Sequence, residues 1–348
     1  MPFRLYSDRS YLAPGAPHVP ILIPLWGRTP EDPHDPSRGR FERYASSGDT
    51  IFRLDSLENC DAAIFPQSWG GVIGDEAAEA RAAAFVDRAL AAGKPPVIFF
   101  WNDSSKAVGL DATVFRTSLF RSQRLPREFA QPAWSEDFVE RYLGGHVPIR
   151  TLDARPVVGF CGSAPREPRP ATAAGRMRRK IARRRQVPEQ EGFVRARALD
   201  VLETHPDVDT NVVARETFWG GMAYIEDLEG RLRVRREYVQ NIVESDYVLC
   251  ARGAGNFSYR LYETLCCGRI PVFIDTDCVL PLESVIDWKS HVVWVDESDV
   301  PRIGDLVAAF HASLSSAEFE DRQRACRRLW ETHLSPHGFF AHFHTHFA

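Results

Sequence analysis

Two arginines and one glutamate stand close together, among small residues, in the stretch 249-LCARGAGNFSYRLYETLCCGRIPVFIDT-276. They are Arg252, Arg260 and Glu263. A guanidinium group binds phosphate oxygens in a bidentate manner, whereas a carboxylate repels phosphate and accepts hydrogen bonds from a sugar diol. This combination is the chemistry of a nucleotide-sugar pocket, in which the arginines bind a diphosphate and Glu263 binds the ribose.

A plainer interpretation fits the same residues. Arg260 and Glu263 are three residues apart, so on a helix they can form a solvated surface ion pair while the glycines simply make a turn. Two common phosphate-binding motifs do not match, because the stretch has neither the Gly-Lys-Ser/Thr of a Walker A loop nor the spacing G-x-G-x-x-G.

Two strands and a loop must position the charged side chains. The apolar run Tyr247–Cys250 predicts one buried strand, and residues 270–274 predict the next. Between them, Gly253 and Gly255 permit a tight loop and a close approach of the backbone to a ligand.

A helix is predicted after this loop, over residues 259–267. Ser258 is its expected N-cap and Gly268 its stop. The helix N-terminus then faces outward at the carboxyl end of a strand, where free N–H groups and the positive dipole end favour an anion. The best match for that anion is a diphosphate.

Composition narrows the class of protein. The chain has 348 residues, of which 44% are hydrophobic and 26% charged, with a net charge of -4. These values are ordinary for a globular protein of two domains and give no general reason to bind nucleic acid. No apolar run approaches the roughly 20 residues of a membrane span, and the first residues do not resemble a signal peptide.

The seven cysteines indicate the redox state of the cellular compartment in which the protein works. Their number is odd, no C-x-x-C occurs, and several lie in apolar runs, so we expect buried thiols in a reducing cytosol rather than disulfides or a zinc site. The expected location is cytoplasmic, with peripheral association at the inner face of the membrane as an open alternative.

Strands alternate with helices along the chain, which predicts an α/β fold with parallel sheets. In the first half the predicted strands are 18–24, 61–65, 96–101 and 114–120, with a helix over 75–92, a mobile loop over 28–40 and a proline-rich surface stretch over 125–134. In the second half the predicted strands are 157–161, 212–215 and 292–295, with helices near 173–185, 192–203, 238–244, 303–314 and 317–333.

The segment 144-GGHVPIRTLDARP-156 is the predicted linker between the two halves of the chain. We therefore predict an acceptor-side domain over 1–150, a donor domain over 151–330 and a helical tail over 331–348, with a ligand cleft between the two domains.

The second half resembles the exostosin family of glycosyltransferases. The family pattern is, in outline, R-G-x-G-x-x-S-x-R-x-x-E-x-L-x-x-G-x-I-P-V. This sequence meets it at Arg252, Gly253, Gly255, Ser258, Arg260, Glu263, Leu265, Gly268, Ile270, Pro271 and Val272. The segments 280-LPLESVIDW-288 and 158-VGFCGSA-164 resemble further family segments, and two segments of the first half look weakly like bacterial members.

The resemblance implies a GT-B architecture, in which two Rossmann-like domains face each other across a cleft. It implies an inverting transfer from a nucleotide-sugar, UDP-type being the first expectation, to a glycan or lipid-linked acceptor in surface polysaccharide synthesis, with no required metal or other cofactor. By motif position, Glu263 binds the ribose, Arg252 and Arg260 neutralise the leaving diphosphate, and Gly162 lets a loop approach the phosphates.

The general base is the least defined part of this hypothesis. Asp103 follows a predicted strand at its carboxyl end, where a cleft residue is expected, although an aspartate there also suits a turn or an N-cap. Because the base is uncertain, a non-catalytic module that binds nucleotide or glycan is the alternative function.

Three further signals have competing interpretations. The sequence Asp275-Thr276-Asp277 resembles a metal-binding D-x-D, but a loop role is favoured. The basic run 176–185 suits nucleic acid, a membrane surface or a diphosphate, but a solvated helix face is simpler. The histidine-rich tail suits a metal, but its interleaved phenylalanines favour packing.

Overall fold

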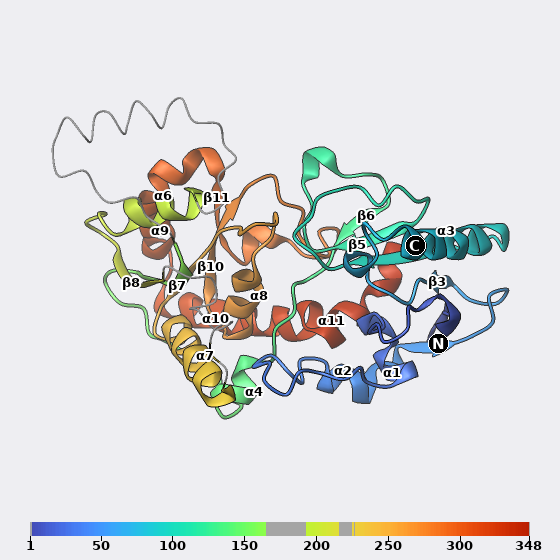
Figure 1. Cartoon of the computed structure of the whole chain (residues 1–348). Coiled ribbons are helices and arrows are strands. Elements are labelled where there is room, and N and C mark those ends of the chain that lie inside the picture. The colour runs from blue at the N-terminus through green and yellow to red at the C-terminus, as the bar shows by residue number, and fades with distance from the viewer. Residues whose placement is uncertain (1, 165–192, 216–224, 226, 348) are drawn as a thin grey trace.

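Two parallel β-sheets form the framework of the protein, each flanked by helices (Figure 1). The structure is a computed structural model, which describes residues 2–164, 193–215, 225 and 227–347. Both sheets are parallel throughout their named strand pairs, so the predicted α/β class and the GT-B arrangement are confirmed.

The first sheet has the strand order β2-β1-β3-β4-β5-β6. Its strands are β1 (Phe3–Tyr6), β2 (Phe52–Leu54), β3 (Ala62–Ile64), β4 (Pro96–Phe100), β5 (Thr113–Arg116) and β6 (Glu128–Ala130). Its helices are α1 (Ile23–Trp26), α2 (Glu42–Ser47) and α3 (Glu76–Ala91), whereas α4 (Phe138–Tyr142) follows the sheet and packs against helices of the second half. Helix α3 begins where predicted, because the Asp75 side chain accepts hydrogen bonds from the Ala77 and Ala78 N–H groups.

The second sheet has the order β11-β10-β9-β7-β8. Its strands are β7 (Val157–Ser163), β8 (Asp209–Arg215), β9 (Tyr247–Cys250), β10 (Ile270–Asp275) and β11 (Val293–Asp296). Its helices are α6 (Phe193–Leu202), α7 (Leu228–Val243), α8 (Tyr259–Cys266), α9 (Ile303–Ala312) and α10 (Ser316–Leu329). Strand β9 is buried along its whole length, as expected for a parallel strand covered on both faces.

The sequence-based prediction is wrong in two places of the first half. Residues 18–24 are not a strand, since Pro20–Leu22 form a 3-10 turn and α1 follows. A proline has no N–H group to donate, which costs a hydrogen bond inside a strand but none at the start of a helical turn. The stretch 125–134 is not a surface segment, since it contains β6 and the buried Trp134, whose indole N–H donates to the Leu334 carbonyl at 3.0 Å.

The end of the chain returns to the first sheet (Figure 1). After α10, a π-helical turn (Trp330–Leu334) leads into α11 (Pro336–Ala341), where Phe339 and Phe340 are fully buried. Phe340 packs on Phe52 at 6.2 Å and Phe343 on Phe115 at 5.1 Å between ring centroids. The tail is therefore helical and packs by its aromatic residues, and the domain boundaries near 150 and 330 stay a prediction.

Three further expectations concern metal sites, membrane-spanning helices and the cysteines. Within the described ranges, no three or more His, Cys, Asp or Glu residues gather as a metal site would require, and no helix could cross a membrane. All seven cysteines are buried free thiols. The basic run 176–185 and the helix predicted over 173–185 lie outside the described residues.

Candidate functional site

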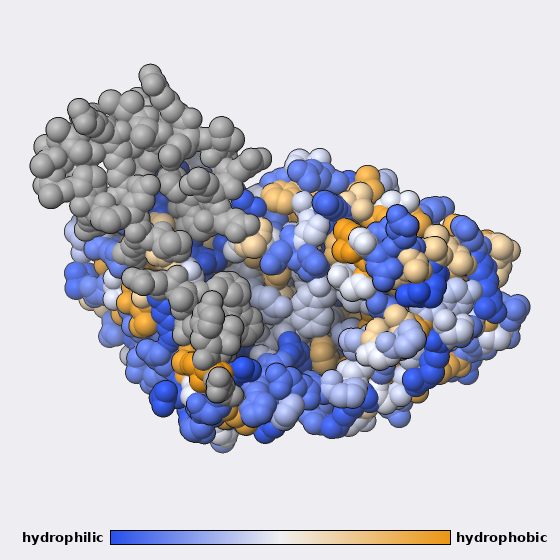
Figure 2. Space-filling model, in the orientation of Figure 1, coloured by the Kyte–Doolittle hydropathy of each residue, from blue (hydrophilic) through white to orange (hydrophobic). Residues whose placement is uncertain are grey.

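A cavity of about 750 Å³ lies between the two sheets, on a face that is hollowed at its centre (Figure 2). The carboxyl ends of β4, β7 and β9 meet there with the N-terminus of α8, which is where open α/β folds bind ligands. Most of the predicted site residues line this cavity: Asp103, Gly162, Gly253, Gly255, Ser258, Arg260 and Glu263.

Arg252 is placed differently. Its guanidinium carbon lies 5.7 Å from the centroid of the Phe120 ring, and the side chain does not line the cavity. Its main-chain carbonyl, however, accepts a hydrogen bond from Arg195 at 2.9 Å. The predicted contact between Arg252 and a diphosphate therefore has no support from this geometry.

Arg260 extends into the cavity from the first turn of α8. Its Nη2 donates to the Cys161 carbonyl at 2.8 Å, and its guanidinium carbon lies 4.3 Å from the centroid of the Phe160 ring. In the described part of the chain no carboxylate pairs with it, and its buried Nε has no hydrogen-bond partner. A cation held this way has its charge available for an anion.

Arg195 is a second cation of this kind, and the sequence did not identify it. It comes from α6, lines the cavity, and donates to the Ser163 carbonyl at 2.8 Å. Burial, followed by the charge of Arg260, lowers its pKa to about 10, so it remains protonated at neutral pH. It too has no carboxylate partner among the described residues. Arg197 stands two residues further along the same helix, and the sequence gave no basis for choosing between the two arginines.

Glu263 is buried rather than solvated: its side chain is 5% exposed. The Ser135 hydroxyl donates to its Oε1 at 2.6 Å, Arg235 Nη2 donates to the same oxygen at 3.1 Å, and the Tyr238 hydroxyl donates to Oε2. The alternative of a surface Arg260–Glu263 ion pair is therefore wrong. Arg235 and Tyr238 come from one face of α7, a spacing of three that could have marked them, but Ser135 had no signal in the sequence.

At two glycines of the site, any larger residue would come too close to a neighbouring side chain. At Gly162, an added Cβ would lie 2.7 Å from Arg260 Nη2, so this glycine leaves room for the arginine itself. At Gly255, an added Cβ would lie 2.9 Å from the Asp103 carboxylate, which comes from the other domain. The Asp103 carboxylate therefore lies close to the loop at Gly255, at the edge of the cavity.

Ser258 precedes α8 as predicted, but its side chain makes no capping hydrogen bond. Ser258 is thus the N-cap by position and by its extended backbone, and its side chain does not occupy the N–H groups at this helix terminus. The terminus opens on the cavity beside Arg260, which keeps it suitable for an anion.

Asp275 and Asp277 have protein partners. The Ser122 N–H donates to the Asp277 carboxylate at 3.0 Å, and Arg121 lies 3.5 Å from that of Asp275. Asp277 has a left-handed φ of 65°, which fits a tight loop. These contacts join the two domains, so the loop role is favoured over the metal role.

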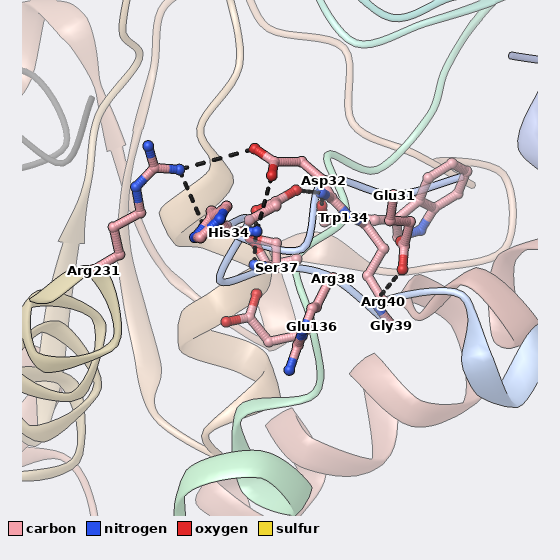
Figure 3. A network of polar contacts seen from close by, with 12 residues as sticks. Glu31, Asp32, His34, Ser37, Arg38, Gly39, Arg40, Trp134, Glu136 and Arg231 are labelled. Carbon is pink, nitrogen blue, oxygen red and sulfur yellow. Dashed lines mark hydrogen bonds and ion pairs between the residues drawn. The ribbon is translucent and has the colours of Figure 1, made fainter. Parts of the chain in front are cut away.

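The loop over 28–40 crosses towards α7, and its own side chains order it (Figure 3). The Arg231 guanidinium of α7 donates to the His34 carbonyl at 3.1 Å and lies 4.0 Å from the Asp32 carboxylate. Arg40, at the end of this loop, pairs with Asp35 and lines the cavity. The loop predicted to be mobile therefore forms part of the wall of the site.

Comparison with known proteins agrees with this geometry. The family described as the exostosin GT47 domain matches residues 147–310. Exostosin-1 of Drosophila melanogaster is 34% identical over 108 residues, which are 31% of this chain and 14% of that protein. A probable glucuronosyltransferase of Oryza sativa subsp. japonica is 39% identical over 72 residues, and a probable beta-1,4-xylosyltransferase of Arabidopsis thaliana is 36% identical over 72 residues.

The segment shared with the two plant proteins covers 21% of this chain and 17% of each of them, so the chain aligns with only a minor part of these relatives. The matched family region contains the whole second sheet and the predicted motif, in agreement with the resemblance seen in the sequence. Residues 147–310 of the chain are therefore similar to the exostosin GT47 domain, and this similarity supports a glycosyltransferase.

Proposed function

We propose that this protein transfers a sugar, with inversion, from a nucleoside-diphosphate sugar of UDP type to a glycan or lipid-linked saccharide. The observation that carries the proposal is the pair Arg195 and Arg260, two cavity-lining cations without a carboxylate partner among the described residues. Two such charges beside a helix terminus complement the charge that a departing nucleoside diphosphate develops.

The proposed reaction is a single displacement. The acceptor oxygen forms a bond to the anomeric carbon while the bond from that carbon to the diphosphate oxygen breaks. Asp103 accepts the proton of the acceptor hydroxyl, and Arg195 and Arg260 stabilise the leaving diphosphate. Glu263 has one acceptor position left on Oε2, next to Tyr238, where a ribose hydroxyl would bind.

The wider setting is part of the proposal. The buried free thiols suit a reducing compartment, which supports a cytoplasmic reaction with any lipid-linked acceptor at the inner face of the membrane. Synthesis of a surface polysaccharide rests on the family resemblance. Because two arginines and a helix terminus supply the positive charge, the proposed reaction requires no metal or other cofactor.

The test is a panel of nucleoside-diphosphate sugars incubated with the full chain and glycan acceptors. Release of free nucleoside diphosphate, with the sugar found on an acceptor, is the expected result, and it should survive EDTA. Tight binding with neither transfer nor slow hydrolysis would instead favour the alternative of a non-catalytic binding module. Loss of activity in EDTA with rescue by Mn²⁺ would return Asp275 and Asp277 to consideration as metal ligands.

A further inference from the structure

A buried cluster of charges connects the wall of the cavity to the segment between β6 and α4. Arg235 Nε and Nη2 donate to the two carboxylate oxygens of Glu136, each at 3.1 Å, and Nη2 also donates to Glu263 at 3.1 Å. The side chains of Glu136, Arg235 and Glu263 are 3%, 6% and 5% exposed. Glu136 lies between β6 and α4, below the loop over 28–40 (Figure 3), whereas Glu263 lies on α8.

Stability alone does not account for such a cluster. Burying an ion pair costs desolvation energy, and well-packed apolar side chains are often as stable in its place. Here two carboxylates share one guanidinium, so the cluster carries a net negative charge. Hydroxyl groups donate to further acceptor positions: Tyr142 donates to Glu136 at 2.8 Å, and Ser135 and Tyr238 donate to Glu263. These hydrogen bonds therefore fix the orientation of the two carboxylates.

The ionisation states agree with this arrangement. Burial alone would raise the pKa of the Glu136 carboxyl, but the charge of Arg235 brings that pKa below its usual value. Burial, and then the charge of Glu263, raises the pKa of the Tyr238 hydroxyl well above its usual value. Glu136 thus remains an acceptor and Tyr238 remains a donor at neutral pH.

We propose that Arg235 is a positioning residue for the nucleotide and that Glu136, from the segment between β6 and α4, holds Arg235 in place. Glu263 would then be oriented for the ribose by α7 and this segment together. This inference rests on the proposed function, because it takes the cavity to bind a nucleoside diphosphate. It has a specific consequence: nucleotide affinity depends on Glu136, although Glu136 does not line the cavity where the nucleotide binds.

The experiment is calorimetric titration of the full chain with UDP, for wild type and the variant Glu136→Gln. The matched control is Asp246→Asn, which removes another fully buried carboxylate paired with an arginine, Arg150, at 2.5 Å but outside the cavity. Both variants should lose thermal stability. Only Glu136→Gln should weaken UDP binding, by about tenfold, as expected when a hydrogen-bonded charge loses its orientation.

Steady-state kinetics separate positioning from chemistry. Glu136→Gln should raise KM for the donor while kcat changes less than about threefold. If Glu136→Gln does not fold, Tyr142→Phe removes only one hydrogen bond to Glu136 and should still weaken UDP binding about threefold. Unchanged UDP affinity in whichever variant folds would overturn the inference. Failure of the wild type to bind any nucleoside diphosphate would overturn the proposed function itself, and this inference with it.

Discussion

The two sides of the cavity are built in different ways. On the donor side, the loop over 251–258 and the helix α8 form one continuous segment, to which α6 adds Arg195 and α7 adds Arg235. On the acceptor side, Arg40 comes from the loop over 28–40, and Trp101 and Asp103 come from the loop after β4. The donor-side cation Arg260 is held by a carbonyl and an aromatic ring, whereas Asp103 is exposed. The difference suggests a rigid anion site facing a wall that different acceptors can reach.

The largest effect is expected on the acceptor side. In Asp103→Asn, turnover should fall by about 10² to 10⁴-fold, because an amide cannot accept the proton of the acceptor hydroxyl. Donor affinity should stay within about twofold, as Asp103 belongs to the other wall. Turnover with the best nucleotide-sugar of the panel measures the first effect, and calorimetry measures the second.

Asp111→Asn is the control for this change, since Asp111 is an exposed aspartate of the same domain that pairs with Arg127. Normal turnover in Asp103→Asn would mean that another group acts as the base. The acceptor-side wall would then not supply the base through Asp103.

The donor side was also the side that the sequence predicted best. Strand β9, helix α8 and strand β10 agree with prediction to within a residue at each end, because apolar parallel strands bounded by glycines give a strong local signal. Ser135, Glu136 and Arg195 could not be identified in the same way. Their positions in the site depend on contacts between segments that are distant in sequence, and no local pattern reports such contacts.

The second prediction separates the two arginines of the sequence motif. Arg260→Ala should reduce turnover by about 10² to 10³-fold, because it removes a preorganised donor to the leaving diphosphate. Arg252→Ala should reduce turnover less than about threefold, because its guanidinium lies over Phe120 and not in the cavity. Equal losses in the two variants would show that Arg252 turns into the site when the donor binds.

The third prediction concerns how the end of the chain stabilises the acceptor-side sheet. The His346 ring packs on Phe115 and Phe129, at 4.9 Å and 4.6 Å between ring centroids, and burial lowers its pKa from 6.5 to about 4. Since the folded state binds this proton less well than the unfolded state, the stabilisation is complete above pH 6.5 and is lost as the pH falls towards about 4.

Denaturant unfolding at pH 7.5 and pH 5 measures this effect. The wild type should lose about 2 kcal/mol more than His346→Phe between these two values. His146→Gln, at an exposed histidine, is the control and should behave as the wild type. An identical loss in His346→Phe would show that the tail does not couple the sheet to pH.

The smallest effect distinguishes two glycines of the donor side. In Gly162→Ala, the new Cβ would lie 2.7 Å from Arg260 Nη2 and displace the guanidinium from the Cys161 carbonyl. Turnover should fall about tenfold, less than in Arg260→Ala, because the arginine is moved rather than removed. In Gly253→Ala, the atom of the described residues that the new Cβ would meet is Arg195 Nη2, at 3.8 Å, which is ordinary contact. That variant should therefore keep its turnover and its stability unless the bound donor itself approaches the backbone at Gly253. A loss of UDP affinity confined to Gly253→Ala would place the nucleotide against this loop, and a Gly162→Ala variant with normal turnover would show that Arg260 does not need its present position.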